Sequence, residues 1–461
     1  MAKSAVLPKK GAVFSLNGTA GVADRMSAGK SRRKKVPRSS HAARHISPRR
    51  ADPLAILEES NLGRVPELVP IRYGRMVKSP FAFLRGSAAI MASDLANTPI
   101  LGNKVQACGD SHLANFGLFA TPERNLIFDI NDFDETVPAP WEWDVKRLAT
   151  SIFVAGRHIG SSDKTCALAA RAAVAAYRER MRECSQATQL EVWYSRVAAN
   201  LIERLMRSVS DPEMSAIIKK ARSNTSAHAL PKITKVTHGK RRIADNPPLV
   251  YHGLESVRKL FREHARRYVQ TLRPDIRVLV ERYHFVDAAL KVVGVGSVGT
   301  RCGIVLLMAA DNDPLFLQFK EAMPSVLEPY SGKSQFENHG ERVVTGQRLM
   351  QAASDIFLGW FQSTDGRDYY VRQLVDMKAT AEIDGMSTAA LTEYGVICAV
   401  ALARAHARSG DAAFISGYLG NKTIFDSAVA VFARHYADQT ESDYSKLVAA
   451  VKAGRIKAKM E

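Results

Sequence analysis

The sequence CGDSHLANFGLFATPERNLIFDINDFDE occupies residues 108–135 and predicts a polar loop, a hairpin and a strand that ends in acidic residues. Within six residues the loop carries a carboxylate on Asp110, an imidazole on His112 and a carboxamide on Asn115. The strand expected at residues 125–130 delivers further carboxylates at its end. All of these polar side chains can therefore face one ligand.

These residue types suit phosphoryl transfer, which needs a carboxylate near the attacking hydroxyl and oxygen ligands for magnesium. We expect Asp110 to be the catalytic carboxylate, with His112 as a second catalytic candidate. The expected metal ligands are Asn115 and Asp132, joined by Asp134. The alternative is that each acid caps a turn and that the histidine is a hydrogen-bonded core residue. Their joint occurrence favours the functional interpretation.

The segment resembles the catalytic core of the aminoglycoside-phosphotransferase and choline-kinase-like kinases, whose loop reads H-G-D-x-H-x-x-N. Four positions match this pattern: Gly109, Asp110, His112 and Asn115. Cys108 replaces the opening histidine, so the bracing that this imidazole supplies is expected to be absent. The resemblance implies that Asp144, on the helix that follows, braces the catalytic loop. Asp129, inside the strand, is predicted to be structural.

A second stretch, ALKVVGVGSVGTRCGIVLLMAADNDPLFLQFK at residues 289–320, contains the motif G-x-G-x-x-G at Gly294, Gly296 and Gly299. The motif alone fits both dinucleotide-binding folds and kinases. A dinucleotide site would continue into a helix, whereas residues 300–309 form an apolar run that is typical of a strand. We therefore expect a hairpin whose glycines cover nucleotide phosphates, with a plain tight turn as the alternative.

Lys320 ends the next predicted strand, where its ammonium could reach the α- and β-phosphates of a nucleotide. Glu341, which opens a predicted helix, is the candidate ion-pair partner of Lys320. The alternative is an acid that the helix dipole favours at this position. Residues 369–374 are expected to form the strand that enters an adenine-binding hinge.

The two stretches come in an unusual order. In ordinary kinases the glycine loop and the lysine precede the catalytic loop, but here they follow it by roughly 180 residues. A circular permutation accounts for this order. The predicted fold is therefore α+β: a bilobal, circularly permuted protein-kinase-like fold with a large helical lobe and a small antiparallel-sheet lobe. Its predicted parts are a helical lobe with the catalytic loop at 51–284, a nucleotide lobe at 285–378 and helices returning to the helical lobe at 379–461.

The net charge of +19 lies mainly in residues 1–50, which hold 13 Lys/Arg and one acidic residue. This segment includes KSRRKKVPR at residues 30–38 and shows no hydrophobic periodicity, so we predict a disordered basic tail. The tail could contact a polyanion such as nucleic acid or anionic lipid, or it could have no fixed partner.

The apolar runs of the chain are far shorter than the roughly 20 residues of a membrane span, and residues 1–30 lack the apolar core of a signal peptide. Five widely spaced cysteines argue against a disulfide framework and against a structural zinc site. We therefore expect a cytoplasmic protein without a membrane span.

Six phrases between about Arg72 and His406 are similar to the bacterial family known as domain of unknown function 2252: SPFAFLRGSAAIM, CGDSHLANFG, FDINDFDET, EWDVKRLA, GQRLMQAASDIFLGW and YYVRQLVDMK. That family name implies no reaction. The two motif regions predict an ATP- and magnesium-dependent phosphotransferase that acts on an unidentified hydroxyl acceptor, with a small molecule favoured over a protein. The alternatives are a pseudokinase-like nucleotide-binding module without turnover and, because Gly109-Asp110-x-His112 matches part of a bimetal ligand pattern, a metallophosphoesterase.

Overall fold

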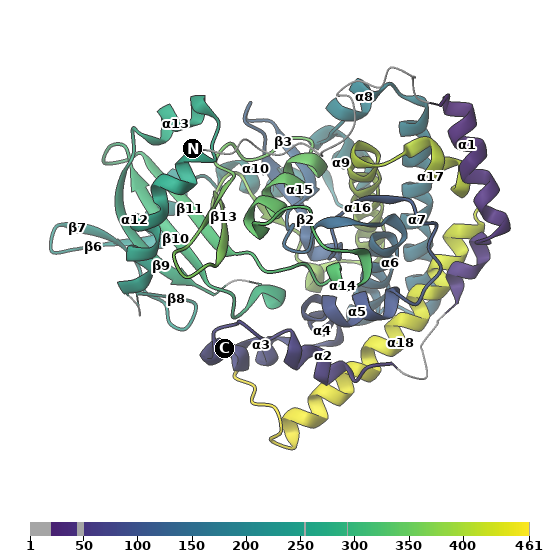
Figure 1. The fold of residues 1–461 in the computed structure, drawn as a ribbon, viewed down its shortest axis with the longest axis horizontal. Coiled ribbons are helices and arrows are strands. Elements are labelled where there is room, and N and C mark those ends of the chain that lie inside the picture. Colours follow the sequence, from purple (N-terminus) through teal and green to yellow (C-terminus); the bar gives the residue numbers. More distant parts are fainter. Residues whose placement is uncertain (1–19, 44–49, 253–254, 293, 461) are drawn as a thin grey trace.

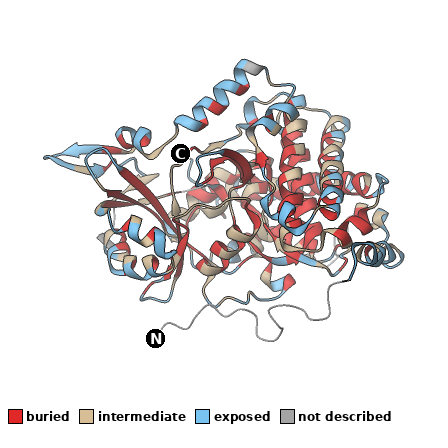
Figure 2. Cartoon of the chain, turned by 90° about the horizontal axis from the view of Figure 1, so that it is seen from above, coloured by how far each residue is buried: buried red, intermediate tan, exposed pale blue. Residues whose placement is uncertain are grey.

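The computed structural model describes residues 20–43, 50–252, 255–292 and 294–460. It is a mixed α+β structure in which a sheet-rich lobe lies beside a larger helical lobe (Figure 1). Buried residues are concentrated in the central sheet and in the inner helices of the helical lobe (Figure 2). The loop at residues 108–115, called the catalytic loop after the role predicted for it, lies between these two regions.

A six-stranded antiparallel sheet in the order β12-β13-β11-β10-β9-β8 forms the smaller lobe. Its strands are β8 (Val250–Tyr251), β9 (His284–Lys291), β10 (Cys302–Met308), β11 (Pro314–Glu321), β12 (Gly359–Gln362) and β13 (Asp368–Gln373). β9 and β10 pair as neighbours, as predicted for a hairpin around the glycine motif. The central strands β10 and β11 are buried along their whole length, which explains their continuous apolar runs.

Helices cover both faces of this sheet. On one face lie α12 (Glu255–Gln270) and α13 (Pro274–Val280), and Phe261 of α12 stacks on Phe319 of β11. On the other face lie α11 (Ser226–Ile233) and the hairpin of β6 (Thr234–Thr237) and β7 (Lys240–Ile243). The predicted boundary at residue 285 is therefore wrong. The sheet lobe begins near residue 226, because the apolar faces of α11 and α12 pack on the strands.

The helical lobe is centred on four long or buried helices: α6 (Trp141–His158), α7 (Asp163–Gln186), α16 (Thr388–Ser409) and α18 (Ile424–Lys452). By length and composition α16 could cross a membrane, but 67% of its apolar window is buried inside the protein. It also carries Arg404, whose guanidinium is paired with buried Asp129. This packing is what the core helix of a globular lobe shows.

A small sheet in the order β14-β2-β3-β5 positions the catalytic loop. Its strands are β2 (Phe116–Ala120), β3 (Leu126–Ile130), β5 (Val197–Ala198) and β14 (Ala379–Thr380), and β1 (Lys104–Ala107) pairs separately with β4 (Val137–Pro140). Residues 108–115 therefore lead from β1 into β2, and residues 131–136 lead from β3 into β4. The two loops lie side by side, since Asn131 donates its amide N–H to the carbonyl of Asn115 at 2.8 Å.

The remaining helices connect or cover these parts. They are α2 (Pro53–Glu59), α3 (Val69–Met76), α4 (Pro80–Gly86), α5 (Ala88–Leu95), α8 (Gln189–Tyr194), α9 (Ala199–Leu205), α10 (Asp211–Ser223), α14 (Glu328–Ser331), α15 (His339–Met350) and α17 (Ala412–Leu419). α4 and α5 are separated at Ser87, which leaves the helical conformation. The chain ends beside α3, where Lys459 donates its N–H to the carbonyl of Pro70 at 2.8 Å (Figure 1).

The prediction of a disordered tail is wrong for residues 20–43. Residues 22–31 form helix α1 (Val22–Ser31), which crosses α17 so closely that a Cβ on Gly29 would lie 1.9 Å from the carbonyl oxygen of Phe414. Arg33 and Arg38 then donate to carbonyl groups at the end of α17, where the helix dipole favours positive charge. These basic residues thus have an intramolecular partner. The rest of the predicted tail, residues 1–19 and 44–49, lies outside the described residues.

Candidate active site

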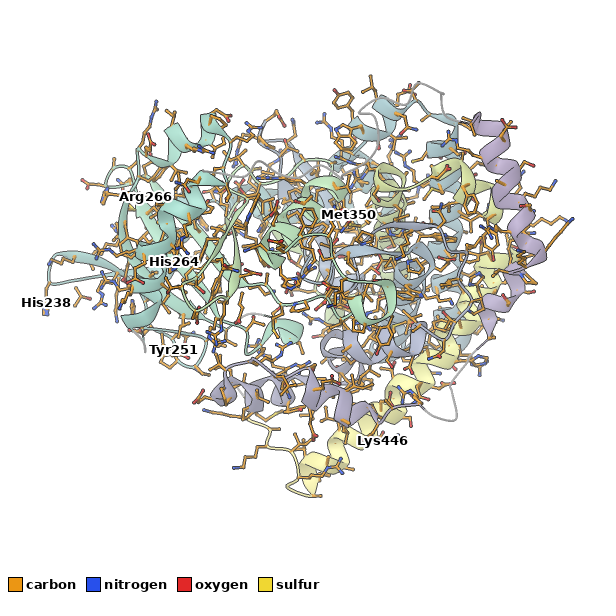
Figure 3. All side chains as sticks on the ribbon, in the orientation of Figure 1. His238, Tyr251, His264, Arg266, Met350 and Lys446 are labelled. Atoms are coloured by element: carbon orange, nitrogen blue, oxygen red, sulfur yellow. The ribbon has the colours of Figure 1, made fainter. Side chains whose placement is uncertain are left out.

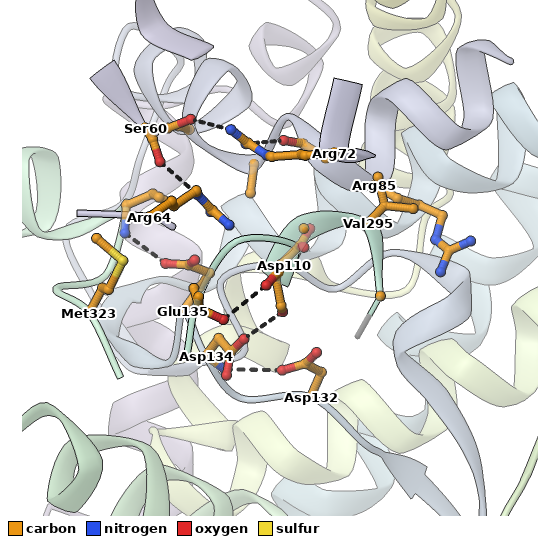
Figure 4. A pocket seen from close by; sticks show the side chains of 18 of the residues that line it. Ser60, Arg64, Arg72, Arg85, Asp110, Asp132, Asp134, Glu135, Val295 and Met323 are labelled. Carbon is orange, nitrogen blue, oxygen red and sulfur yellow. Dashed lines mark hydrogen bonds between the residues drawn. The ribbon is translucent and has the colours of Figure 1, made fainter. Parts of the chain in front are cut away.

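One cavity of about 420 Å³ contains residues from both predicted stretches. From the first stretch it is lined by Asp110, His112, Asn115, Asp132 and Asp134, and from the second by Gly294, Gly296 and Ser297. The α2–α5 segment closes a further side with Arg64, Arg72 and Arg85 (Figure 4). Two stretches that lie far apart in the sequence therefore meet at one site.

The catalytic loop is held by Asp144 on the first turn of α6. Its carboxylate accepts the backbone N–H groups of Cys108 at 2.6 Å and Gly109 at 2.9 Å. The structure thus contains the brace that the sequence predicts for this aspartate. Gly109 has a φ of +84°, and a Cβ here would lie 2.4 Å from the carbonyl oxygen of Glu135, so only glycine fits this position.

A histidine also takes part in this brace, although the opening histidine of the motif is replaced by Cys108. Nε2 of His406, at the end of α16, lies 3.0 Å from Oδ2 of Asp144, and its Nδ1 lies 2.8 Å from the hydroxyl of Tyr177. α16 ends beside β1, where Gln106 donates its N–H to the hydroxyl of Ser409. Position 108 thus carries no imidazole, but a distant helix places the ring of His406 against the bracing carboxylate of Asp144.

Asp110 has one carboxylate oxygen engaged and one available. Its Oδ1 accepts from Nε and Nη2 of Arg147 at 2.9 and 2.6 Å, whereas its Oδ2 lies 3.6 Å from Nε2 of His112, beyond hydrogen-bond distance. Burial raises the pKa of Asp110, and Arg147 opposes this shift. Burial also lowers the pKa of His112 well below its ordinary value, and the charges of Arg85 and Arg147 lower it further. Burial and these charges therefore favour the neutral form of the His112 ring.

Two of the three predicted metal ligands can hold a hard cation. Asn115 donates its Nδ2 to the carbonyl of Asp110 at 2.7 Å, which leaves its amide oxygen as an acceptor. The Asp132 carboxylate, just after β3, forms no direct ion pair among the described residues, although the charges of Lys320 and Arg372 act on it. It accepts the N–H of Asp134 at 3.2 Å. Magnesium needs only one or two carboxylates besides phosphate oxygens and water, so this donor set fits it.

Asp134, the third predicted ligand, is already engaged by three donors. Its Oδ2 accepts from the Lys320 ammonium and from the Ser297 hydroxyl at 3.0 Å, and its Oδ1 accepts from the Tyr370 hydroxyl at 2.8 Å. Burial alone would raise the pKa of Asp134. The charge and hydrogen bond of Lys320, the Tyr370 hydrogen bond and the Arg372 charge together outweigh burial, so the pKa lies below its usual value. Asp134 would have to release Lys320 to bind a metal.

Lys320 therefore pairs with Asp134 and not with Glu341, so the predicted Lys320–Glu341 ion pair is wrong. The Lys320 ammonium also lies 2.5 Å from the hydroxyl of Ser297 in the glycine loop. Glu341 lies on the first turn of α15, and the residue that reaches the site from this helix is its neighbour Arg342. Arg342 donates to the backbone carbonyls of Asp134 and Thr136 at 2.8 and 2.6 Å.

The glycine loop is fixed to the helical lobe. Gly299, with a φ of +93°, accepts the N–H of Val65 at 2.7 Å, and Val298 accepts Nη1 of Arg64 at 2.6 Å. A Cβ on Gly296 would lie 3.2 Å from the carbonyl oxygen of Arg85. The loop thus reaches across from the sheet and forms one wall of the cavity.

The family comparison covers most of the chain. A family model described as "Uncharacterized protein conserved in bacteria (DUF2252)" matches residues 64–450. The chain belongs to the DUF2252 family. Neither the curated proteins nor the solved structures gave a match to it.

In this DUF2252 protein, the sequence analysis assigned no role to several residues of the site. Arg147 stands three residues after Asp144 on α6, and this spacing places both side chains on one helix face toward the loop. That spacing was a signal that could have identified Arg147. Arg85 stands within the phrase SPFAFLRGSAAIM, and Arg64 and Arg72 precede it, but no pattern points to a cavity, so their place at the site becomes visible only in the fold.

Proposed function

We propose that this protein is an ATP- and magnesium-dependent phosphotransferase that acts on a hydroxyl group of a small molecule. One observation carries the proposal: a loop with a free carboxylate oxygen on Asp110, the metal-type donors Asn115 and Asp132, and a glycine loop joined to Lys320 all meet at one cavity. Each part has a role in phosphoryl transfer, and the parts come from separate regions of the chain.

The reaction assigned to this site moves a phosphoryl group from ATP to the acceptor. Oδ2 of Asp110 accepts the proton of the acceptor hydroxyl, whose oxygen forms a new bond to the γ-phosphorus while the bond to the β–γ bridging oxygen breaks. The bond's electron pair leaves with ADP. Arg147 holds Oδ1 of Asp110, so the second oxygen stays directed at the cavity.

Charge on the phosphates is matched by the remaining residues. A magnesium ion held by Asn115 and Asp132 would neutralise negative charge on the β- and γ-phosphate oxygens. The Lys320 ammonium is positioned by Asp134 and Ser297 beside the glycine loop, where it can bind phosphate oxygens when it leaves Asp134. The backbone of the glycine loop supplies further donors.

The proposal includes a circularly permuted kinase-like fold. Its support is the position of α16, which ends beside β1 and contributes His406 to the catalytic-loop brace although it follows that loop by nearly 300 residues. In a chain with the usual order, such a helix would lead directly into the loop. The acceptor is expected to be small, because the cavity of about 420 Å³ must also hold the terminal phosphates.

A nucleotide-binding module without turnover is the second candidate. One observation favours it: Asp134, the third predicted metal ligand, is engaged by Lys320, Ser297 and Tyr370. Turnover that needs Lys320 or Asp134 would require these contacts to open. A metallophosphoesterase has less support, because no group of three or more His, Cys, Asp or Glu suited to a metal occurs among the described residues.

The experiment measures phosphate transfer and nucleotide binding separately. Purified protein with ATP, magnesium and mixtures of hydroxyl metabolites should give ADP and a new phosphate ester in ³¹P NMR spectra, and Asp110→Asn should abolish the ester while binding the non-hydrolysable analogue AMP-PNP with magnesium. Asp365→Asn, an exposed residue of the sheet lobe, is the control and should retain turnover. Binding of AMP-PNP without any turnover would favour the second candidate, and absence of both would refute the proposal.

A further inference from the structure

Three arginines at the cavity have no carboxylate partner. Arg64 donates to the carbonyls of Ser60 and Val298 at 2.9 and 2.6 Å, and Arg72 donates to the hydroxyl of Ser60 and the carbonyl of Gly86 at 3.0 and 2.9 Å. Neither forms an ion pair among the described residues. All of these acceptors are neutral, so neither guanidinium is paired directly with a carboxylate, although Glu135 of the same cavity acts on both charges from a greater distance.

Arg85 is even less satisfied. It lines the cavity, donates no hydrogen bond within the described part of the chain, and its Nε is buried without a partner, as is Nε of Arg72. Arg72 is only 2% exposed, and burial lowers its pKa to about 9, with the Arg64 charge lowering it further. Placing cations in such a site is unfavourable unless an anion joins them.

Three buried arginines elsewhere in this lobe have carboxylate partners: Arg147 pairs with Asp110, Arg178 with Asp426, and Arg404 with Asp129. Arg64, Arg72 and Arg85 form no such pair among the described residues, and all three line one cavity, on the segment from α2 to α4 (Figure 4). Their shared feature is access to a ligand.

The position of the cluster relative to Asp110 decides which ligand it meets. Lys320 and the β10–β11 strands lie on the nucleotide side of the acids, whereas Arg85 lies close enough to Asp110 and His112 for its charge to act on both. In Figure 4 the arginines lie above and beside Asp110, and Asp132 and Asp134 lie below it. Arg64 also donates to Val298 of the glycine loop, so the cluster extends from that loop to Asp110. Asp110 faces the acceptor hydroxyl in the proposed reaction, which places Arg85 at the acceptor end of the cluster.

We infer that Arg64, Arg72 and Arg85 form an anion subsite and that the acceptor is a hydroxyl compound that already carries a phosphate group. This inference rests on the proposed function. Guanidinium groups bind phosphate oxygens through paired, charge-assisted hydrogen bonds, and three of them match a dianionic monoester. Neutral alcohols and amines would leave the three charges uncompensated and are excluded as good substrates.

The test compares phosphorylated and neutral compounds on the full chain. Thermal unfolding and calorimetry with inorganic phosphate, glucose 6-phosphate, glycerol 3-phosphate, glucose and glycerol should show binding of the phosphorylated compounds and phosphate only. Arg85→Gln and Arg64→Gln should each weaken that binding by about tenfold or more, the range expected for loss of a charged hydrogen bond. Lys78→Gln removes an exposed charge from the same segment and should leave binding unchanged.

Folding and nucleotide binding serve as internal checks. Arg85 donates no hydrogen bond in the described structure, so Arg85→Gln should unfold within a few degrees of the wild type without ligand. Equal binding of neutral and phosphorylated compounds, or wild-type phosphate affinity in both arginine variants, would overturn the inference. An equal loss of AMP-PNP–magnesium affinity in these variants would assign the arginines to the nucleotide and also overturn it.

The inference and the proposed function can fail separately. If the arginine variants lose phosphate binding but the wild type transfers no phosphoryl group from ATP, the anion subsite holds and the proposed function fails. If the wild type phosphorylates neutral alcohols at rates that Arg64→Gln and Arg85→Gln do not change, the proposed function holds and the acceptor assignment fails.

Discussion

Replacing Asp144 by asparagine should loosen the catalytic loop more than it loosens the rest of the lobe. The Asp144 carboxylate accepts the N–H groups of Cys108 and Gly109 and faces His406. The contacts with Cys108 and His406 are buried, and the contact with Gly109 is partly buried. An amide group has one acceptor oxygen, so one backbone N–H would face an NH₂ group and the other contacts would lose their charge. A hydrogen bond to a charged group contributes about 1.5–3 kcal/mol, and a neutral one about half as much.

The summed effect is a loss of about 3–5 kcal/mol in the free energy of unfolding. Urea unfolding followed by tryptophan fluorescence measures it directly, because Trp141 and Trp143 lie on the same first turn of α6 as Asp144. Hydrogen–deuterium exchange at residues 108–115 measures the loop itself. We expect faster exchange there in Asp144→Asn than in the wild type.

Asp129→Asn is the matched control. Asp129 is as deeply buried and pairs with Arg404, but it holds β3 and the end of α15, not the catalytic loop. This variant should lose a comparable free energy of unfolding while exchange at residues 108–115 stays near the wild-type rate under native conditions. An Asp144→Asn protein with unchanged loop exchange, or with a stability within about 1 kcal/mol of the wild type, would refute the role of the brace.

Four further outcomes follow from the structure. Lys320→Met should weaken AMP-PNP–magnesium binding by about 10- to 100-fold in calorimetry, whereas the exposed Lys333→Met should not change it. Asp132→Asn should raise the magnesium concentration that gives half-maximal turnover, and excess EDTA should stop turnover in the wild type; turnover that persists in EDTA would contradict a metal role. Burial raises the pKa of Glu135 from 4.5 to about 7. This carboxyl therefore stabilises the fold below pH 4.5, and the stabilisation is lost as the pH rises to about 7. We expect Glu135→Gln to have a free energy of unfolding about 1–3 kcal/mol above the wild type at pH 8 and similar to it at pH 4. Gly29→Ala should cost about 1–3 kcal/mol of stability by forcing α1 away from α17, whereas Gly385→Ala, which meets no neighbour, should be neutral.

The local parts of the fold could be predicted because their signals are contiguous. The loop from Asp110 to Asn115 and the acids after β3 lie within one stretch of 28 residues, joined by strands whose apolar runs are clear. The hairpin around Gly294–Gly299 followed from the apolar strands on either side of it. In each case the neighbours that determine the conformation are close in the sequence.

Features that depend on distant contacts could not be predicted in this way. The partner of Lys320 is Asp134 and not Glu341, because β11 places the ammonium above the loop after β3 and α15 presents Arg342 to the site. The basic segment at 30–38 has a composition typical of a tail, but Arg33 and Arg38 bind carbonyl groups at the end of α17. A run of basic residues shows how much charge a segment carries. It does not show whether a folded part of the same chain binds that charge.

Positive charge also gathers on the exposed hairpin of β6 and β7, whose tip at His238 projects from the sheet lobe (Figure 3). The hairpin carries Lys235, Lys240, Arg241 and Arg242. The hairpin lies at the edge of the lobe, whereas Arg64, Arg72 and Arg85 line a cavity beside catalytic-type residues. Charge at an exposed hairpin is solvated and needs no ligand, while the same charge in a cavity does. Because of this difference in solvation, we base the proposed anion subsite on the cavity arginines and not on the hairpin.

The brace of the loop at residues 108–115 does not depend on a histidine within the loop motif itself. Cys108 cannot brace the loop as an imidazole would, yet His406 reaches Asp144 from α16 and the loop keeps its conformation. A brace requires a ring in the right place and is indifferent to which part of the chain supplies it. If that argument is correct, His406→Phe should increase exchange at residues 108–115 much as Asp144→Asn does, while Tyr177→Phe, which removes only the outer hydrogen bond of the ring, should have a smaller effect. If hydrogen–deuterium exchange at residues 108–115 is the same in all three variants as in the wild type, neither Asp144 nor His406 holds the loop.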